Sequence, residues 1–405
     1  MKKVFVVGGG AAGLMAALSS AMSGNDVTIF EKNDRLGRKL LITGKGRCNL
    51  TNIATDNDFM DNIPGNSKFI FSAFNKFSNL DLINFLNNNG LRTKVERGGR
   101  VFPESDKALD VLNFFIKMLG RYNVKINYNS EVKDIITKEN KISGILIHNE
   151  LKYCDSVILA TGGLSYPVTG STGDGYDFAK KLGHTIIDLK PSLVPLVTYE
   201  NTKELMGLSL KNINAGIYYK NKLIKEEFGE LLFTHFGLSG PIILTLSRYI
   251  KDYVGKELLI KIDLKPALSN DKLDNRLLRD FEKYSKRVLK NSLDDLLPQT
   301  LIPYIIKISE IDPEKKTSKI TKEERKKLIQ HLKRLTFKIK GTLPIEEAII
   351  TSGGIFTKEI NPSTMESKII KGLFFAGEII DVDGLTGGFN LQIAFSTGYV
   401  AGLNS

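Results

Sequence analysis

The apolar positions at the start of the chain predict a strand, a helix and a second strand. Residues 4–7 (Val-Phe-Val-Val) are all apolar, which is typical of a strand buried on both faces of a parallel sheet. Apolar residues then recur at helical spacing over residues 14–21, and Gly24 provides a helix stop. A second apolar run at residues 27–30 ends at Glu31. This segment therefore predicts a complete βαβ unit.

The periodicity changes further along the chain. Residues 156–160 repeat the pattern of a buried strand, and residues 191–265 alternate as β-strands do, with Gly and Asn turns, which indicates a barrel or a sandwich. Residues 270–337 become helical and highly charged. From about residue 346 the chain returns to apolar strands and glycines, and it ends in a helix near residues 391–402. We predict one α/β domain made of both chain ends and interrupted by an insertion.

Composition narrows the class of protein. The 405 residues are 42% hydrophobic and 25% charged, which is ordinary globular usage and argues against a disordered chain. The apolar runs are shorter than a membrane span, and the N-terminal run stops after four residues, so we expect neither a membrane segment nor a signal peptide. Two cysteines and four histidines argue against a disulfide framework and leave little for a metal site. We expect a cytoplasmic protein without a metal.

The turn between the first strand and the helix carries the first chemical signal. It reads Gly-Gly-Gly-Ala-Ala-Gly, in which Gly8 permits a tight turn, Gly10 lets the backbone approach a pyrophosphate, and Gly13 lets the helix pack closely. The helix N-terminus then presents free N–H groups to phosphates. In this strand–turn–helix–strand context the pattern predicts dinucleotide binding rather than an ordinary tight turn.

An acidic residue stands where a dinucleotide would place a ribose. Glu31 lies 18 residues after Gly13, at the end of the second strand. A carboxylate there accepts hydrogen bonds from ribose hydroxyls, whereas a 2′-phosphate would meet a negative charge. We therefore do not expect NADP at this site.

Cations and glycines alternate directly after the second strand. Residues 36–39 read Leu-Gly-Arg-Lys, and residues 43–52 read Thr-Gly-Lys-Gly-Arg-Cys-Asn-Leu-Thr-Asn. This composition favours a position near a pyrophosphate or a ribityl chain, and the alternative is a solvated basic surface loop. Cys48 has no neighbouring partner cysteine, so we interpret it as a packing residue beside the cofactor rather than half of a redox disulfide.

Two later glycine segments follow buried strands. Residues 160–163 read Ala-Thr-Gly-Gly, and residues 372–378 form a strand that ends in Gly377-Glu378. Residues 383–392 are a glycine loop that leads into a helix beginning around Asn390. A helix N-terminus stabilises the negative charge of a reduced flavin. NAD domains have no need of the late strand–glycine–acid element, so the order of these segments predicts FAD.

At these segments the sequence resembles the BaiN-like family of FAD-dependent oxidoreductases, which also includes aminoacetone oxidase-type flavoproteins. The resemblance covers essentially the whole chain. Its most specific pieces are residues 37–52, 99–105, 160–176, 232–241, 351–355, 364–368 and 374–398. One departure is Lys45, where the family commonly has glycine.

The resemblance implies an α/β fold with a discontinuous Rossmann-like FAD-binding domain, a β-rich, barrel-like insertion and a nested helical subdomain. We place the FAD-binding domain at residues 1–190 and 346–405, the insertion at 191–268 and 336–345, and the helical subdomain at 269–335. FAD contacts are implied at Glu31, Lys32, Arg47, Cys48, Asn49, Thr161, Gly162, Gly377, Glu378, Asn390 and Gln392. The predicted cofactor site is completed by Gly8, Gly10, Ala11, Ala12, Gly13, Arg38, Lys39, Thr43, Gly44, Val132, Ala160, Gly388 and Leu391.

The substrate side of the site is less defined. The best candidates for catalytic groups are Arg47, Tyr166 and His235. Histidine is the side chain most easily used for proton transfer near neutral pH, but His235 is equally consistent with local scaffolding beside a helix start. Arg97 and Arg100 flank two glycines, where they would either clamp an anionic substrate or project into solvent from a hairpin turn.

The chain carries a formal net charge of +12, and residues 311–340 hold 11 Lys and Arg against four Asp and Glu. An RNA partner would account for this excess. However, Leu328, Leu332 and Leu335 recur at helical spacing, and Phe337 is the lone aromatic residue, so an amphipathic helix with a lysine-rich outer face is the simpler interpretation.

We therefore predict an FAD-dependent oxidoreductase that transfers a hydride between a small organic substrate and non-covalently bound FAD. The alternatives are an amine or aminoketone oxidase that uses O₂, and a flavin-dependent RNA-binding or tRNA-modifying protein. Because the chain holds a single dinucleotide fingerprint, we expect the substrate to reduce the flavin and O₂ or another acceptor to reoxidise it.

Overall fold

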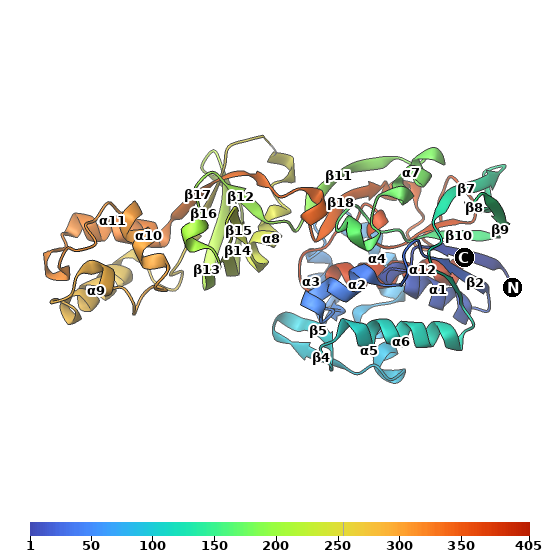
Figure 1. Cartoon of the computed structure of the whole chain (residues 1–405), viewed down its shortest axis with the longest axis horizontal. Helices are drawn as coiled ribbons and strands as arrows, with labels where there is room; N and C mark the ends of the chain where they lie inside the picture. The colour runs from blue at the N-terminus through green and yellow to red at the C-terminus, as the bar shows by residue number, and fades with distance from the viewer. Residues whose placement is uncertain (254) are drawn as a thin grey trace. The chain divides into compact units, whose positions relative to one another are not determined.

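In the computed structural model, residues 1–253 and 255–405 are described, and they form two compact units (Figure 1). The first unit comprises residues 1–192 and 345–405, and the second comprises residues 193–344. The chain thus leaves the first unit after Ser192 and returns to it at Ile345.

A five-stranded parallel sheet forms the centre of the first unit. Its strand order is β19 (Leu373–Phe375), β10 (Ser156–Leu159), β1 (Lys3–Val7), β2 (Asp26–Phe30) and β6 (Lys125–Asn127). The inner strands are almost entirely buried because helices cover the sheet, which explains their unbroken apolar runs. The βαβ unit expected from residues 4–31 is confirmed, with α1 (Ala11–Met22) between β1 and β2.

Helices of the first unit come from both ends of the chain. α12 (Phe389–Asn404) lies beside α1, where Ser19 Oγ donates to the Tyr399 carbonyl oxygen at 2.8 Å. Figure 1 shows the two helices together, one dark blue and one red. The remaining helices are α2 (Arg38–Ile42), α3 (Asp56–Asp61), α4 (Ser67–Lys76), α5 (Asn79–Asn88), α6 (Ala108–Arg121) and α7 (Asp174–Lys181). The first unit is therefore built from two separate segments, one from each end of the chain.

Three small antiparallel sheets complete the first unit. They are β3 (Thr51–Asn52), β5 (Arg100–Pro103) and β4 (Thr93–Glu96); β7 (Val132–Lys138), β8 (Lys141–Ile147) and β9 (Glu150–Tyr153); and β11 (Ile186–Ser192) with β18 (Ile350–Ile355). The last pair contains the two segments at which the chain leaves and re-enters the unit.

The second unit contains a closed six-stranded barrel, which is one of the two folds that its alternating pattern indicated. Neighbouring strands pair antiparallel in the order β12 (Leu196–Thr198), β15 (Gly237–Ser239), β14 (Lys222–Phe233), β13 (Ser209–Tyr219), β16 (Leu258–Asp263) and β17 (Leu335–Thr342). Side chains such as Ile217, Ile260 and Phe337 are fully buried. The described residues of the second unit also form four α-helices, which are α8 (Pro241–Ser247), α9 (Asn270–Lys283), α10 (Leu301–Ile308) and α11 (Lys322–Lys333). The finer division at residues 269–335 stays a prediction.

Candidate functional site

The turn that joins β1 to α1 is built by glycines. Gly8 has φ +102°, and a Cβ there would lie 2.6 Å from the Ala160 carbonyl oxygen. A Cβ on Gly13 would clash with the Gly8 carbonyl oxygen. Both positions therefore exclude any larger residue, because β10 and α1 approach the turn directly.

Gly10 differs from these two glycines. It has ordinary extended backbone angles (φ −78°, ψ −174°), and no atom lies within 4 Å of the position of an added Cβ. This empty space belongs to a pocket that Gly10 itself lines. The protein thus leaves the backbone exposed at the start of α1, where helix N–H groups favour a phosphate.

Glu31 is buried at the carboxyl end of β2 and lines the same pocket. Its Oε2 accepts a hydrogen bond from Gly9 N at 2.8 Å, and its Oε1 accepts from Asn33 N at 2.9 Å and Asn33 Nδ2 at 2.7 Å. A carboxylate has about four acceptor positions, so the three bonds leave one for a ligand hydroxyl. The contacts fix the carboxylate in place without saturating it.

The segment after residue 165 closes this end of the pocket through side-chain contacts. Lys32 Nζ lies 2.6 Å from Asp174 Oδ2, and Asn33 Nδ2 donates to the Thr169 carbonyl oxygen at 3.2 Å. Partial burial acts to raise the pKa of Asp174, but the hydrogen bonds from Lys32 and Thr172 outweigh it, and the pKa lies below its ordinary value. Asp174 therefore stays ionised at neutral pH and holds Lys32 at the pocket wall.

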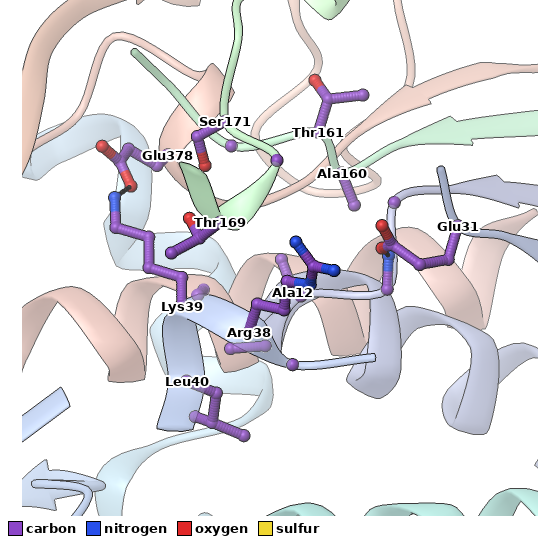
Figure 2. Close-up of a pocket in the computed structure, with 18 of the residues that line it drawn as sticks. Ala12, Glu31, Arg38, Lys39, Leu40, Ala160, Thr161, Thr169, Ser171 and Glu378 are labelled. Carbon is purple, nitrogen blue, oxygen red and sulfur yellow. Dashed lines mark hydrogen bonds and ion pairs between the residues drawn. The ribbon is translucent and has the colours of Figure 1, made fainter. Parts of the chain in front are cut away.

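Figure 2 shows Glu31 on one side of the pocket and Lys39 with Glu378 on the other. Lys39 Nζ donates to Glu378 Oε2 and to Ser165 Oγ, both at 2.6 Å. Glu378 Oε1 accepts from Ser165 Oγ at 2.9 Å and from Thr351 N at 2.8 Å. The Lys39 and Glu378 side chains are only 24% and 14% exposed, so this cluster is a polar wall made from four distant segments.

The N-terminus of α12 supplies a further wall. Gly388 caps the helix with φ +106°, and Asn390 and Leu391 line the pocket. The Asn390 side chain is occupied elsewhere, since Oδ1 accepts from Gly384 N at 2.7 Å and Nδ2 donates to the Gly384 carbonyl oxygen at 2.8 Å. The helix therefore offers its backbone N–H groups and partial positive charge to a ligand.

Several features of the pocket wall test whether a dinucleotide fits. The open space at Gly10 leaves room for a diphosphate beside the N-terminus of α1, and one acceptor position of Glu31 is free for a ribose hydroxyl. Lys32 and Arg38 add cations to the lining. The lining therefore fits a dinucleotide such as FAD.

The pocket brings together many of the residues predicted from the sequence. Those that line it are Gly8, Gly10, Ala11, Ala12, Glu31, Lys32, Arg38, Lys39, Thr43, Val132, Ala160, Thr161, Gly162, Glu378, Asn390 and Leu391. Those that do not line it are Gly13, Gly44, Arg47, Cys48, Asn49, Gly377, Gly388 and Gln392. Of the second group, Gln392 is fully buried and its Nε2 donates to the Phe77 carbonyl oxygen at 3.1 Å.

Several pocket residues were missed by the sequence analysis. They include Asn33, Ser130, Glu131, Thr169, Phe178, Ile349 and Ile350. Asn33 had a usable signal, because it follows Glu31, the predicted ribose ligand, by two residues. Ile349 and Ile350 had none, since they lie over 300 residues from the glycine turn and reach the pocket only through the fold.

The three candidate catalytic groups lie outside the lining of this pocket. The Arg47 guanidinium pairs with Glu96 and Asp106 and stacks on Phe102 at 4.2 Å from the ring centroid. Tyr166 is partly buried, and burial raises the pKa of its hydroxyl. His235 is an exposed residue of the second unit, in the short connection between β14 and β15. Their catalytic roles stay predictions.

Cys48 is fully buried, and burial raises the pKa of its thiol to about 12. A thiol of this kind is a packing residue at neutral pH. Within residues 1–253 and 255–405, no group of three or more His, Cys, Asp and Glu side chains is arranged to hold a metal ion. No helix of the described chain is long and apolar enough to cross a membrane.

Residues 2–404 match the protein family described as "HI0933-like protein Rossmann domain". It is 32% identical to a 3-dehydro-bile acid delta(4,6)-reductase of Clostridium scindens, over 99% of this chain and 98% of the relative. It is 33% identical to a ribosomal RNA dihydrouridine synthase of Haemophilus influenzae, over 98% and 97% of the two chains. An Escherichia coli protein with the same name is 29% identical over 97% and 95%.

Among solved structures, the fold is similar to that of a 3-ketosteroid-delta4-(5alpha)-dehydrogenase from Rhodococcus jostii, with a TM-score of 0.53 and 14% identity over 100% of this chain and 96% of that chain. A 3-ketosteroid delta1-dehydrogenase from Sterolibacterium denitrificans gives a TM-score of 0.53 at 11% identity, over 99% of both chains. At these identities the similarity is one of fold.

The glycine turn, the buried acid at the end of β2 and the helix N-terminus of α12 converge on one pocket, and the family match spans nearly every residue of the chain. The protein therefore belongs to the HI0933-like family and is an FAD-dependent oxidoreductase.

Proposed function

We propose that the protein transfers a hydride between bound FAD and a small organic substrate, in the direction that reduces a carbon–carbon double bond conjugated to a carbonyl group. The main support for FAD as the cofactor is a single pocket. Its lining includes Gly10, which leaves open space beside the backbone, and Glu31, whose carboxylate is held in place by hydrogen bonds. The direction is supported by the names of two full-length relatives, a delta(4,6)-reductase and a dihydrouridine synthase. Both names describe the addition of hydrogen to an unsaturated compound. This direction is the opposite of the electron flow expected from the single dinucleotide fingerprint, in which the substrate reduces the flavin.

Residues of the first unit have separable roles in this proposal. The backbone at Gly10 and the start of α1 bind the diphosphate, and Glu31 binds a ribose hydroxyl. The N-terminus of α12 stabilises negative charge at the opposite end of the cofactor. Lys39 and Glu378 neutralise each other at the wall, so the pocket gains polar contacts without a net charge. Reduced FAD, when bound, would supply the hydride, solvent water would supply the proton, and an external two-electron donor would reduce the flavin again between turnovers.

The experiment uses purified protein loaded with FAD and reduced by dithionite without oxygen, so that the result does not depend on the physiological electron donor. We expect a conjugated dienone steroid to reoxidise the flavin and to be converted to its dihydro product, as detected by mass spectrometry. A saturated ketone of the same skeleton is the control and should leave the flavin reduced. Reoxidation by O₂ alone, with no enone or uracil compound reduced, would contradict the proposed direction and favour the oxidase alternative.

A second candidate substrate is RNA, and the charge of the second unit favours it. Residues 193–344 contain 29 Lys and Arg against 19 Asp and Glu, so they hold +10 of the total net charge of +12. An excess of this kind attracts polyanions. Reduced holoprotein should then convert uridines in a ribosomal RNA fragment to a product heavier by two hydrogens, and binding should weaken as salt increases.

A further inference from the structure

A hairpin turn of the first unit presents two arginines. Arg97, Gly98, Gly99 and Arg100 connect β4 to β5, and the two glycines have φ +76° and +72°. Both arginine side chains are exposed, and Arg100 Nε donates to the Arg97 carbonyl oxygen at 3.1 Å. A Cβ on Gly98 would meet no atom within 4 Å, whereas a Cβ on Gly99 would lie 2.5 Å from Asn52 Oδ1, so the turn is open at Gly98 and packed at Gly99.

The turn is fixed beside the segment that begins α12. Asn52, which is almost fully buried, donates through Nδ2 to the Gly98 carbonyl oxygen at 2.9 Å and to the Gly387 carbonyl oxygen at 3.1 Å. Ile53 N donates to the Gly99 carbonyl oxygen at 2.8 Å. One side chain thus joins the turn to the glycine loop before α12, whose residues Asn390 and Leu391 line the cofactor pocket.

The charges around the turn do not cancel. Glu96 and Asp106 are already paired with Arg47 and Lys94, and the hydrogen bonds from these cations lower the pKa of both carboxyl groups. Arg97 and Arg100 have no carboxylate partner in the part of the chain that the structure describes. They are the surplus cations of the hairpin.

We propose that Arg97 and Arg100 bind an anionic group of the substrate, a carboxylate or a phosphate, at the mouth of the α12 end of the cofactor pocket. Arginine suits this role because its planar guanidinium forms paired hydrogen bonds with carboxylate and phosphate oxygens. The buried side chain of Asn52 holds the turn in place, so that the turn loses little conformational entropy when an anion binds. The inference rests on the proposed function, since it assumes a substrate that approaches this end of the pocket.

The test compares the parent with R97A/R100A, and the matched control is R92A, an exposed arginine just before β4. The probes are a dienone steroid carboxylic acid with its methyl ester, and uridine 5′-monophosphate with uridine. Binding to oxidised holoprotein is followed by the change in flavin absorbance. We expect the double variant to raise the Kd of one anionic probe at least tenfold, to leave its neutral counterpart unchanged, and to leave the Kd of FAD unchanged.

The two probe pairs identify the source of the anion. A loss confined to the steroid acid assigns a carboxylate, and a loss confined to the nucleotide assigns a phosphate. Equal losses for acid and ester, equal losses in R92A, or no saturable binding of either anion would each overturn the inference. If the arginine-dependent preference persists while no probe is reduced, the proposed function fails and the arginine site stands. If the dienone is reduced and R97A/R100A changes neither the KM of the acid nor the Kd of the nucleotide, only the arginine site fails.

Discussion

The two units of the chain differ most in where their glycines and their charges lie. The first unit contains 29 of the 36 glycines, whereas the 152 residues of the second contain seven. The charges follow the opposite trend, because the first unit has a net charge of +2 and the second has +10. The glycines are thus concentrated in the first unit and the net positive charge in the second.

This difference shows how the two units are specialised. Glycines in the first unit remove side chains where backbone or a ligand must approach, as at Gly8, Gly10 and Gly13. The second unit has an aliphatic core and places its lysines outside, where they add charge without changing the packing. Substitutions that add atoms should therefore affect the first unit, and substitutions that remove charge should affect the second.

The largest effect is expected where an atom is added to the glycine turn. Gly13→Ala places a Cβ against the Gly8 carbonyl oxygen, and we expect it to lower the free energy of unfolding by about 3 kcal/mol and to abolish FAD binding. Gly10→Ala meets no protein atom, so the apoprotein should keep its stability while FAD binding weakens about ten- to a hundredfold. Urea unfolding of both apoproteins and FAD titration measure the difference. Equal stability losses would show that Gly10 is structural rather than a ligand contact.

A smaller effect is expected at the ribose acid. Glu31→Gln keeps the size of the side chain but removes a charged acceptor, and a hydrogen bond to a charged group contributes roughly 1.5–3 kcal/mol. We expect FAD affinity to fall about tenfold or more, and Glu31→Arg to weaken it further. Asp26→Asn, at the opposite end of β2, is the control and should leave FAD affinity unchanged. An unchanged FAD titration in Glu31→Gln would contradict the assignment of Glu31 to the ribose.

The basic charge of the second unit can be tested against that of the first. Lys319, Lys322 and Lys326 are exposed, and none has a carboxylate partner among the described residues. Changing all three to Gln should weaken RNA binding several-fold and lower its salt dependence by about 0.7 for each lost phosphate contact.

The matched control changes Lys68, Lys117 and Lys138, which are exposed lysines of the first unit. It should leave RNA binding as in the parent. Equal losses in the two triple variants would show that the attraction is a property of net charge rather than of the second unit.

The smallest effect is expected at an ion pair between helices α9 and α11. Asp274 accepts from Arg325 Nε at 2.8 Å, and this hydrogen bond lowers the pKa of Asp274 below its ordinary value of 3.8. Stability from the pair is present above about pH 4 and is lost as the pH falls through the lowered pKa. Asp274→Asn should therefore cost about 0.2–1 kcal/mol at pH 7 and progressively less toward pH 3, measured by urea unfolding. Asp294→Asn, at an exposed position, is the control, and a pH-independent cost at Asp274 would refute the assignment.

Local rules explain which predictions could be made from the sequence. The βαβ unit was predictable because strand burial, the glycine turn and the acid at the end of β2 are encoded within 31 consecutive residues. The barrel was predictable as a class from alternating residues, but its closure depends on pairing between β12 and β17, which lie about 140 residues apart. Pairing between strands so far apart in the chain cannot be predicted from a short window of sequence.

By itself, the sequence determined the dinucleotide turn and predicted the ribose acid, because both depend on spacing along a short segment. The prediction of FAD also needed the order of the later glycine segments at residues 160–163 and 372–392. Only the tertiary structure decided which polar side chains reach the pocket. Arg47 and Gln392 carry suitable groups, but Glu96 and Phe77 hold them elsewhere, while Ile349 and Ser165 reach the pocket or its polar wall from distant segments. A side chain's chemistry is set by its residue type, whereas its partners are set by packing between segments that the sequence separates by tens to hundreds of residues.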